Sequence, residues 1–328
     1  TTIMNKKSIL VIADFPNWAY YEIQQFIRKN LSDDFDIYCD FLIFNSIKKS
    51  KNPIKRIKLL VDGIKYRHIK KDNTYDIVVY LAFYFPNYMK INWKSKKIIK
   101  GIYTDGFPPS NSEFKGGMTE FVNMFLNDAD AIVCGSEQIK NRYKKLVNNV
   151  FCANANNNKL LFTRKSRKKI NNSDIFLVGW TGNPNREFKG FYSHIIPAVK
   201  LAQKKYPNIQ LATRFSGPMK TLPGFYENID VVLIASTADA GPSLFMDACI
   251  MGIPAISTNI GKPHELIIDG VNGYIVGRDI NKMSERIIEL YEDRQLLFDM
   301  SKRIKNDYDE MFNDDEVTKE WRDMFNDM

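Results

Sequence analysis

The sequence predicts an α/β protein of two domains, each built on a parallel sheet covered by helices. Two observations lead to this prediction. Short apolar runs alternate with helical patterns along most of the chain, and the polar, charged segment from Thr163 to Asp174 separates two such regions. At 328 residues the chain is long enough for two domains of ordinary size. We expect domains at residues 4–165 and 166–306, followed by a terminal helix at residues 307–328.

The first half is a succession of strand and helix patterns. Lys7 to Ala13 has the continuous apolar pattern of a buried strand, and Tyr20 to Leu31 has helical spacing. Further strands are expected at Phe35–Phe44, Asp76–Ala82 and Lys97–Thr104. A helical pattern from Phe121 to Leu126 precedes a last strand, after which Ser136 is an apt N-cap for the next helix.

The second half repeats this alternation. Expected strands are Ile175–Gly179 and Ile209–Phe215, with a helix at His194–Tyr206 between them. Residues 281–311 have a helical pattern. In the acidic, aromatic tail that follows, Trp321 and Phe325 are the expected anchors of the terminal helix.

The stretch from Ser236 to Gly273 is the most informative part of the second half. An apolar run ends at Ala235 and a small-residue loop follows. A helical pattern then begins near Pro242 or Ser243 and ends at Pro254, where a second apolar run begins. This is the order strand, loop, helix, strand.

Such a loop is an anion site by its geometry. The start of the helix directs unpaired backbone N–H groups and the positive end of the helix dipole at the loop. Asp239 in the loop and Asp247 in the helix would repel a phosphate, but they can accept hydrogen bonds from sugar hydroxyls. The alternative is an N-capping Asp and a solvated helix Asp.

The composition bounds the class of protein. With 44% hydrophobic and 26% charged residues, the chain has the balance of a soluble globular protein. Its apolar runs are far shorter than the ~20 residues of a membrane span, and no signal-peptide pattern opens the sequence. The four cysteines are scattered, with no C-x-x-C pair, and no histidine is adjacent to a cysteine. We expect a cytoplasmic location, no disulfides and no metal site.

Charge is unevenly distributed along the chain. Residues 1–170 carry 30 Lys and Arg against 15 Asp and Glu, whereas residues 171–328 carry 17 against 23. This asymmetry indicates that the first half meets an anionic partner. In the most basic segment, Ser46 to Lys71, a basic amphipathic helix can lie on an anionic membrane surface; the alternative is an ordinary helix with a solvated face. Its apolar stripe is Ile54, Ile57, Leu60, Val61 and Ile64.

The stretch around Asp239 resembles the donor-site signature of glycosyltransferase family 4. That family usually carries two Glu residues where Asp239 and Asp247 stand here, and Lys262 and His264 also depart from its pattern. The residues that keep the order of the signature are Gly252, Pro254, Gly261, Glu265, Asp269, Gly270 and Gly273. The resemblance implies the GT-B fold, in which two Rossmann-like doubly wound domains face a central cleft and a terminal helix crosses back to the first domain.

The resemblance also implies roles for individual residues. Lys189, followed by Gly190, matches a lysine that grips the donor diphosphate, and Arg186 is displaced from the usual arginine place but could serve. Asp105 is the candidate acceptor-side carboxylate, and Asp239 the reader of the hexose hydroxyls. The remaining expected donor-binding residues are Asp247, Gly241, Pro242, Ser243, Leu244, Gly179, Trp180, Thr181 and Gly182.

The function implied is a retaining, metal-independent glycosyltransferase of polysaccharide biosynthesis. It would transfer a hexose from a nucleotide-sugar, most often a UDP-sugar, to a hydroxyl of a glycan, lipid-linked or polymer acceptor, with no cofactor. Its basic half would face an anionic acceptor or the inner face of a membrane. One alternative is a non-catalytic subunit that binds sugar or stabilises a partner. Another is an enzyme acting on modified DNA bases, a less favoured reading because no base-reading motif is visible.

Overall fold

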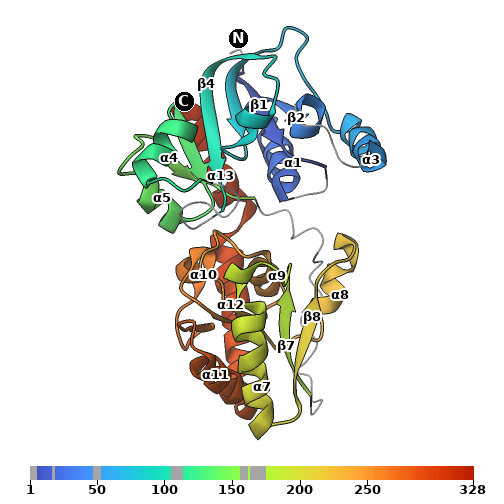
Figure 1. The fold of residues 1–328 in the computed structure, drawn as a ribbon, viewed down its shortest axis with the longest axis vertical. Coiled ribbons are helices and arrows are strands. Elements are labelled where there is room, and N and C mark those ends of the chain that lie inside the picture. The colour runs from blue at the N-terminus through green and yellow to red at the C-terminus, as the bar shows by residue number, and fades with distance from the viewer. Residues whose placement is uncertain (1–5, 17–18, 47–52, 105–113, 156–161, 163–174) are drawn as a thin grey trace. The chain divides into compact units, whose positions relative to one another are not determined.

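The structure is a computed structural model that describes residues 6–16, 19–46, 53–104, 114–155, 162 and 175–328 (Figure 1). The chain divides into two compact units. Unit 1 comprises residues 1–157 and 314–328, and unit 2 comprises residues 158–313. These divisions fall at different positions from those expected at 165/166 and 306/307. Asp105 and the whole expected linker, Thr163 to Asp174, lie outside the described residues.

Unit 1 is built on a six-stranded sheet in which every pairing is parallel. The strand order is β2-β1-β3-β4-β5-β6. Because a strand buried on both faces needs apolar side chains on both, β1 is an unbroken apolar run after its first residue and all six of its residues are buried. The strands are β1 (Ser8–Ala13), β2 (Asp36–Phe41), β3 (Thr74–Tyr80), β4 (Lys94–Ile102), β5 (Ala131–Cys134) and β6 (Val150–Cys152).

Helices connect these strands, and the last helix of the chain completes the unit. Helix α13 contacts α1 and β6, and the side chains of Trp321 and Phe325 are fully buried. The Trp321 indole N–H donates to the carbonyl of Asn154, and Phe325 packs edge-on against Phe35. The helices are α1 (Ala19–Leu31), α2 (Leu42–Asn45), α3 (Pro53–Ile64), η1 (Phe85–Tyr88), α4 (Met118–Phe125), α5 (Glu137–Tyr143) and α13 (Asp314–Asp327).

Unit 2 is built on a five-stranded sheet, also parallel at every pairing. The order β11-β10-β9-β7-β8 shows that the chain adds β8 on one side of β7 and then β9 on the other. The strands are β7 (Phe176–Thr181), β8 (Ile209–Arg214), β9 (Val231–Ile234), β10 (Ala255–Ser257) and β11 (Tyr274–Ile275). Two parallel sheets with connecting helices confirm the predicted α/β fold of two Rossmann-like domains.

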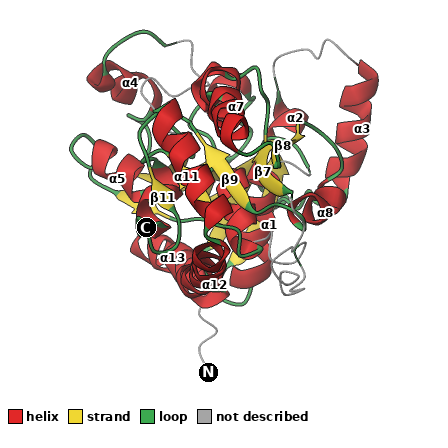
Figure 2. Ribbon diagram, turned by 90° about the horizontal axis from the view of Figure 1, so that it is seen from below, coloured by secondary structure: helices red, strands yellow, loops and turns green. Residues whose placement is uncertain are grey.

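The helices of unit 2 cover both faces of its sheet. Helix α7 contacts α11, whereas α12 contacts α9 and α10, so these helices form two separate groups. Figure 2 shows α7 and α11 on one side of β9, with α12 on the opposite side. The helices are η2 (Glu187–Lys189), η3 (Phe191–Ile195), α7 (Ile196–Lys205), η4 (Met219–Thr221), α8 (Leu222–Tyr226), α9 (Ser243–Ile250), α10 (Gly261–Leu266), α11 (Ile280–Glu292) and α12 (Arg294–Met311).

No helix in the described ranges has both the length and the apolar composition that crossing a bilayer requires.

Candidate functional site

The reversal of strand order in unit 2 lies between β7 and β9. These two strands pair only at Val178 with Val231 and at Gly179 with Val232. Beyond that point β7 continues alongside β8, while β9 continues alongside β10. The loops that leave the carboxyl ends of β7 and β9 therefore diverge above the sheet, which is where open α/β sheets bind their ligands.

An ion pair joins these two loops. Lys189, at the end of η2 after β7, places its Nζ atom 3.2 Å from Oδ2 of Asp239 in the loop after β9. Both side chains are largely buried, with 19% and 18% of their surface exposed. A cation and a carboxylate lie together here, so the same site can bind an anionic group and hydroxyl groups.

Backbone contacts hold the two loops together. The amide of Thr237 donates to the carbonyl of Phe188, the residue before Lys189, over 2.9 Å. Gly190 has a φ of +67°, and a Cβ there would lie 2.9 Å from the carbonyl oxygen of Ala235. Only glycine fits this position without strain, because the backbone is left-handed and the other loop approaches closely. The Lys-Gly pair of the sequence thus has a structural reason as well as a charge.

A third loop, after β10, contacts the backbone of Asp239 and Ala240. A Cβ on Gly261 would lie 2.3 Å from the carbonyl oxygen of Asp239 and 2.1 Å from that of Ala240. The next amide, that of Lys262, donates to the carbonyl of Ala240 over 2.9 Å. Lys262 itself is buried and pairs with Glu265 at 2.6 Å. The Gly261-Lys262 turn therefore fixes the backbone that carries Asp239.

Helix α9 begins directly after this backbone. Its N-cap is Pro242, which provides no side-chain cap. Within the described part of the chain, the amides of Ser243 and Leu244 have no acceptor, and both Gly241 and Ser243 are exposed. The helix start thus offers the free N–H groups and the dipole that the sequence predicted.

Asp247 lies one turn into α9 and is buried, with 2% of its surface exposed. It faces the hydroxyl group of Tyr226, which also lies 3.4 Å from Oγ1 of Thr181 at the end of β7. Burial, and then the negative charge of Asp247, raise the pKa of Tyr226 well above its ordinary value. The structure thus brings Asp247 and Thr181 together through a tyrosine that the sequence analysis did not select.

The other residues expected to bind the donor near β7 are partly exposed and partly packed in the core of unit 2. Arg186 is exposed and makes no ion pair with any described residue. The Trp180 side chain is 2% exposed and packs on Phe191 with ring centroids 4.4 Å apart, so its indole belongs to the core of unit 2. Gly179 packs against Ile229, and Gly182 against the Trp180 ring. These glycines allow close packing at the strand end, and Asp105 lies outside the described residues.

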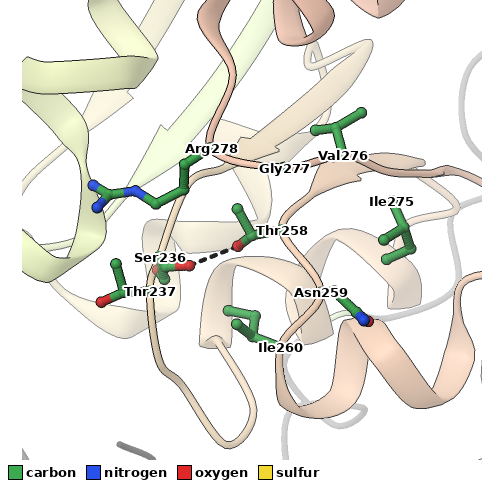
Figure 3. A pocket seen from close by; sticks show the side chains of 9 residues that line it. All are labelled: Ser236, Thr237, Thr258, Asn259, Ile260, Ile275, Val276, Gly277 and Arg278. Carbon is green, nitrogen blue, oxygen red and sulfur yellow. Dashed lines mark hydrogen bonds between the residues drawn. The ribbon is translucent and has the colours of Figure 1, made fainter.

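A cavity of about 390 Å³ lies above the ends of β9, β10 and β11. Figure 3 shows its lining, in which Thr258 donates from Oγ1 to the carbonyl of Ser236 over 2.7 Å. None of the lining residues was selected from the sequence, although all of them lie at or just after the carboxyl end of β9, β10 or β11. They are Ser236, Thr237, Thr258, Asn259, Ile260, Ile275, Val276, Gly277 and Arg278.

This cavity shares a wall with the ion-paired loops. Thr237 lines it and is hydrogen-bonded to Phe188 beside Lys189. Arg278 lines it too, and its guanidinium lies 2.8 Å from where a Cβ on Gly190 would be. The same guanidinium lies 3.3 Å from Nδ1 of His194. Burial, and then the positive charge of Arg278, lower the pKa of His194, so Arg278 is the cation on this wall at neutral pH.

Among the residues that the structure describes, no group of three or more His, Cys, Asp and Glu side chains is arranged to hold a metal ion.

Comparison with protein families identifies part of this unit. Residues 197–307 match the family described as glycosyl transferases group 1. The match begins in α7, so it includes Asp239 and Asp247 but not Lys189. The capsular polysaccharide biosynthesis glycosyltransferase CapM of Staphylococcus aureus is 23% identical over 121 residues. That alignment covers 37% of this chain and 31% of CapM, so the chain spans under a third of this relative. Residues 197–307, which form most of unit 2, are thus similar to glycosyl transferases group 1.

Solved structures extend the likeness to nearly the whole chain. Sucrose-phosphate synthase from Thermosynechococcus elongatus has a TM-score of 0.70 at 13% identity, over 98% of this chain and 99% of that one. HepE from Anabaena, solved in complex with UDP-glucose, has a TM-score of 0.67 at 12% identity, over 98% and 100%. These likenesses show that the two-domain fold is that of GT-B glycosyltransferases.

Proposed function

We propose that this chain is a retaining, metal-independent glycosyltransferase that moves a hexose from a nucleotide-sugar to an acceptor hydroxyl. The observation that carries the proposal is the Lys189–Asp239 pair, at 3.2 Å, where the strand order of a glycosyltransferase group 1 domain reverses. A UDP-sugar is the proposed donor, because HepE, which shares the fold, was solved with UDP-glucose.

Lys189 would stabilise the leaving group. As the bond between the anomeric carbon and the diphosphate oxygen breaks, negative charge grows on the diphosphate. A cation held close to that oxygen lowers the barrier, because it interacts more strongly with the transition state than with the donor. The free amides of Ser243 and Leu244 would bind the same diphosphate. Arg186, which is exposed on the same loop, would provide a second cation.

The two aspartates would bind hydroxyl groups of the donor. Asp239, paired with Lys189, would accept hydrogen bonds from hydroxyl groups of the hexose attached to that diphosphate. Asp247 would accept hydrogen bonds from the ribose hydroxyls. Compared with Glu, each Asp is one methylene shorter, and the Gly261-Lys262 turn contacts the backbone that carries Asp239.

The reaction retains configuration if the acceptor attacks from the face that the diphosphate leaves. The acceptor oxygen would form its bond to the anomeric carbon, and the departing diphosphate would take the hydroxyl proton. This route requires neither a protein base nor a metal ion. The proposed acceptor is a hydroxyl of a glycan, a lipid-linked glycan or a polymer, bound by unit 1. Asp105 is the proposed carboxylate on that side, and the basic first half suits an anionic acceptor or membrane surface at the cytoplasmic face.

The test is UDP release from a panel of UDP-sugars, comparing wild-type protein with Lys189→Ala. We expect kcat to fall by about 10²- to 10³-fold, because one preorganised donor to the developing charge is removed. Lys200→Ala is the matched control, since Lys200 is an exposed lysine on α7 of the same unit. Equal turnover by wild type and Lys189→Ala would refute the assignment of the site.

A non-catalytic sugar-binding subunit is the second candidate. The two Asp residues in place of Glu, and the exposure of Arg186, favour it. This candidate predicts that calorimetry detects UDP-sugar binding while mass spectrometry detects neither hydrolysis nor transfer, across a panel of acceptors. Any acceptor-dependent UDP release would exclude it.

A further inference from the structure

Helix α3, Pro53–Ile64 in unit 1, presents its apolar side chains to solvent. The exposed fractions are 80% for Ile54, 60% for Ile57, 61% for Val61 and 66% for Ile64. Single exposed apolar residues are ordinary on protein surfaces. Four on one short helix are not, because they recur at helical spacing and form a continuous patch.

The geometry of the helix places two lysines on the same face. With 3.6 residues per turn, the four apolar positions occupy an arc of about 80° around the helix axis. Lys65 and Lys58, both exposed, extend that arc by about another 40°. Asp62, the one acidic residue of the helix, is half-buried and lies beyond the lysines. The exposed face is therefore apolar with a basic border.

Contacts on the opposite side of α3 fix this orientation. Gly63 is buried, and a Cβ there would lie 2.8 Å from the ring of Phe44 and 3.4 Å from Pro16. Directly after the helix, the guanidinium of Arg67 lies 4.8 Å from the Phe44 ring centroid and pairs with Asp40 at 2.8 Å. Because this inner face packs closely, the helix cannot turn its apolar side inward without losing these contacts.

We propose that α3 is a docking surface for an anionic lipid bilayer. Ile54, Ile57, Val61 and Ile64 would enter the boundary between headgroups and acyl chains, while Lys58 and Lys65 would remain at the level of the phosphates. Within unit 1, helix α3 lies at the edge of the ribbon in Figure 1.

Charge complementarity selects this occupant over a second copy of the chain. Two copies of α3 packed face to face would bring their lysines together, and residues 1–170 already carry twice as many basic as acidic residues. A bilayer with anionic headgroups satisfies the lysines and the apolar patch together. The docking surface lies in unit 1 and is independent of the proposed activity of unit 2.

The experiment is co-sedimentation of the full chain with vesicles, without any sugar donor. One vesicle type is phosphatidylcholine alone, and the other contains phosphatidylcholine with phosphatidylglycerol. We expect binding to the anionic vesicles only, weakening as salt is added. The double variant Ile57→Asp/Val61→Asp should bind at least about tenfold more weakly, because charged groups replace the inserting side chains.

Lys58→Gln/Lys65→Gln tests the basic border. Each lysine near an anionic leaflet contributes about fivefold in affinity, so this variant should lose roughly twentyfold. The matched controls are Lys144→Gln/Lys145→Gln, which removes the same charge from exposed positions after α5, and Met124→Asp, at an apolar residue of α4 that is 58% exposed. Both controls should bind like wild type.

Three results would overturn the proposal. They are equal binding to both vesicle types, equal loss in the controls and the α3 variants, and a dimer by analytical ultracentrifugation that Ile57→Asp/Val61→Asp dissociates while vesicle binding is absent. Since α3 variants should release UDP from a soluble donor at the wild-type rate, failure of this proposal and failure of the proposed activity can be distinguished.

Discussion

In unit 1 the strand order reverses between β1 and β3, and in unit 2 it reverses between β7 and β9. The side chains at the two reversals differ in kind. At the reversal in unit 2, Lys189 pairs with Asp239 and α9 begins with free amides. At the reversal in unit 1, Asp14 follows β1, and Tyr20 packs edge-on against Phe85 at 5.7 Å between ring centroids. Among the residues that the structure describes, the reversal in unit 2 has charges of both signs, whereas the reversal in unit 1 has aromatic rings and the carboxyl group of Asp14.

This difference shows that topology provides the crevice and the loops decide its ligand. Charged and hydrogen-bonding groups of unit 2 suit a diphosphate and its sugars. In unit 1, Tyr20 also contacts Tyr103 after β4, so apolar ring faces line the strand ends. Aromatic rings of this kind suit a ligand that stacks on them and also forms hydrogen bonds with the protein. This contrast is the reason for proposing that unit 2 binds the donor and unit 1 the acceptor.

After Lys189→Ala, the largest effect is expected from Gly261→Ala in unit 2. The new Cβ would lie 2.1 to 2.3 Å from two backbone carbonyl oxygens, so the loop carrying Asp239 must move. A shift of about 1 Å in a positioned group reduces turnover by about a hundredfold. UDP release measures the effect, and circular dichroism checks the fold. Gly224→Ala, where a Cβ would meet nothing within 4 Å, is the control. Wild-type turnover by Gly261→Ala would break the argument that this loop positions the site.

A smaller effect is expected from Asp247→Asn. This change keeps the shape of the side chain but removes a charged acceptor, which contributes about 1.5–3 kcal/mol to a hydrogen bond. Ribose hydroxyls do not change during the reaction, so the donor KM should rise about 10- to 100-fold with kcat nearly unchanged. Steady-state kinetics separate the two constants. Asp299→Asn, on an exposed position of α12, should leave both unchanged. A loss confined to kcat would contradict the ribose assignment.

Much of the fold could be read from the sequence because buried parallel strands are continuous apolar runs. Asp239 was selected from the pattern of its loop, and Lys189 from the resemblance of its loop to the family's Lys-Gly element. Their contact was not predictable from the chain alone, since it depends on β9 lying beside β7 with β8 outside, and strand order is not written in local periodicity. Lys189 and Asp239 are 50 residues apart in the sequence, so only the tertiary structure brings them into contact.

Other features needed the structure for different physical reasons. A helical stripe has the same period whether it faces the core or solvent, so the outward orientation of Ile57 and Val61 could not be predicted. Trp180 was selected by its place after a strand, but its size favoured the core. Tyr226 and Arg278 have no local motif, and they matter only because other elements bring Asp247 and Gly190 to them.

A still smaller effect, on stability, is expected from Asp14→Asn in unit 1. Burial raises the pKa of Asp14 from 3.8 to about 6, against the opposing hydrogen bond from the Phe15 amide. The negative charge of Asp14 also contributes to the raised pKa of Tyr20, after burial and the charge of Tyr84. The folded state therefore holds this proton more tightly than the unfolded chain does. Between about pH 4 and pH 6, rising pH ionises the unfolded carboxyl first and destabilises the fold.

The wild type should thus lose stability relative to Asp14→Asn as pH rises from about 4 to about 7, by about 2 kcal/mol. Urea unfolding of both proteins at several pH values measures this difference. Asp33→Asn, at an exposed aspartate of the same unit, is the control and should show no such trend. A difference that grows as pH falls would have the wrong sign for a buried, uncompensated carboxyl group. That result would mean that a group other than Asp14 controls the pH dependence of stability between about pH 4 and pH 7.

The smallest effect distinguishes the helix starts of the two units. In unit 1, Ser136 caps α5 by accepting from the amide of Ile139 over 3.3 Å, whereas in unit 2 the N-cap of α9 is Pro242 and provides no such acceptor. Ser136→Ala should lower the free energy of unfolding by about 1 kcal/mol and leave UDP release unchanged.

Pro242→Ser should instead leave the free energy of unfolding nearly unchanged and weaken donor binding. Its hydroxyl would cap the Leu244 amide, a gain that roughly offsets the lost rigidity of proline, while the donor KM rises several-fold because the diphosphate must displace that hydroxyl. Thermal unfolding and donor titration measure the two quantities. An unchanged donor KM in Pro242→Ser would mean that the open start of α9 is not a ligand site, and the contrast between the two units would then depend on the Lys189–Asp239 pair alone.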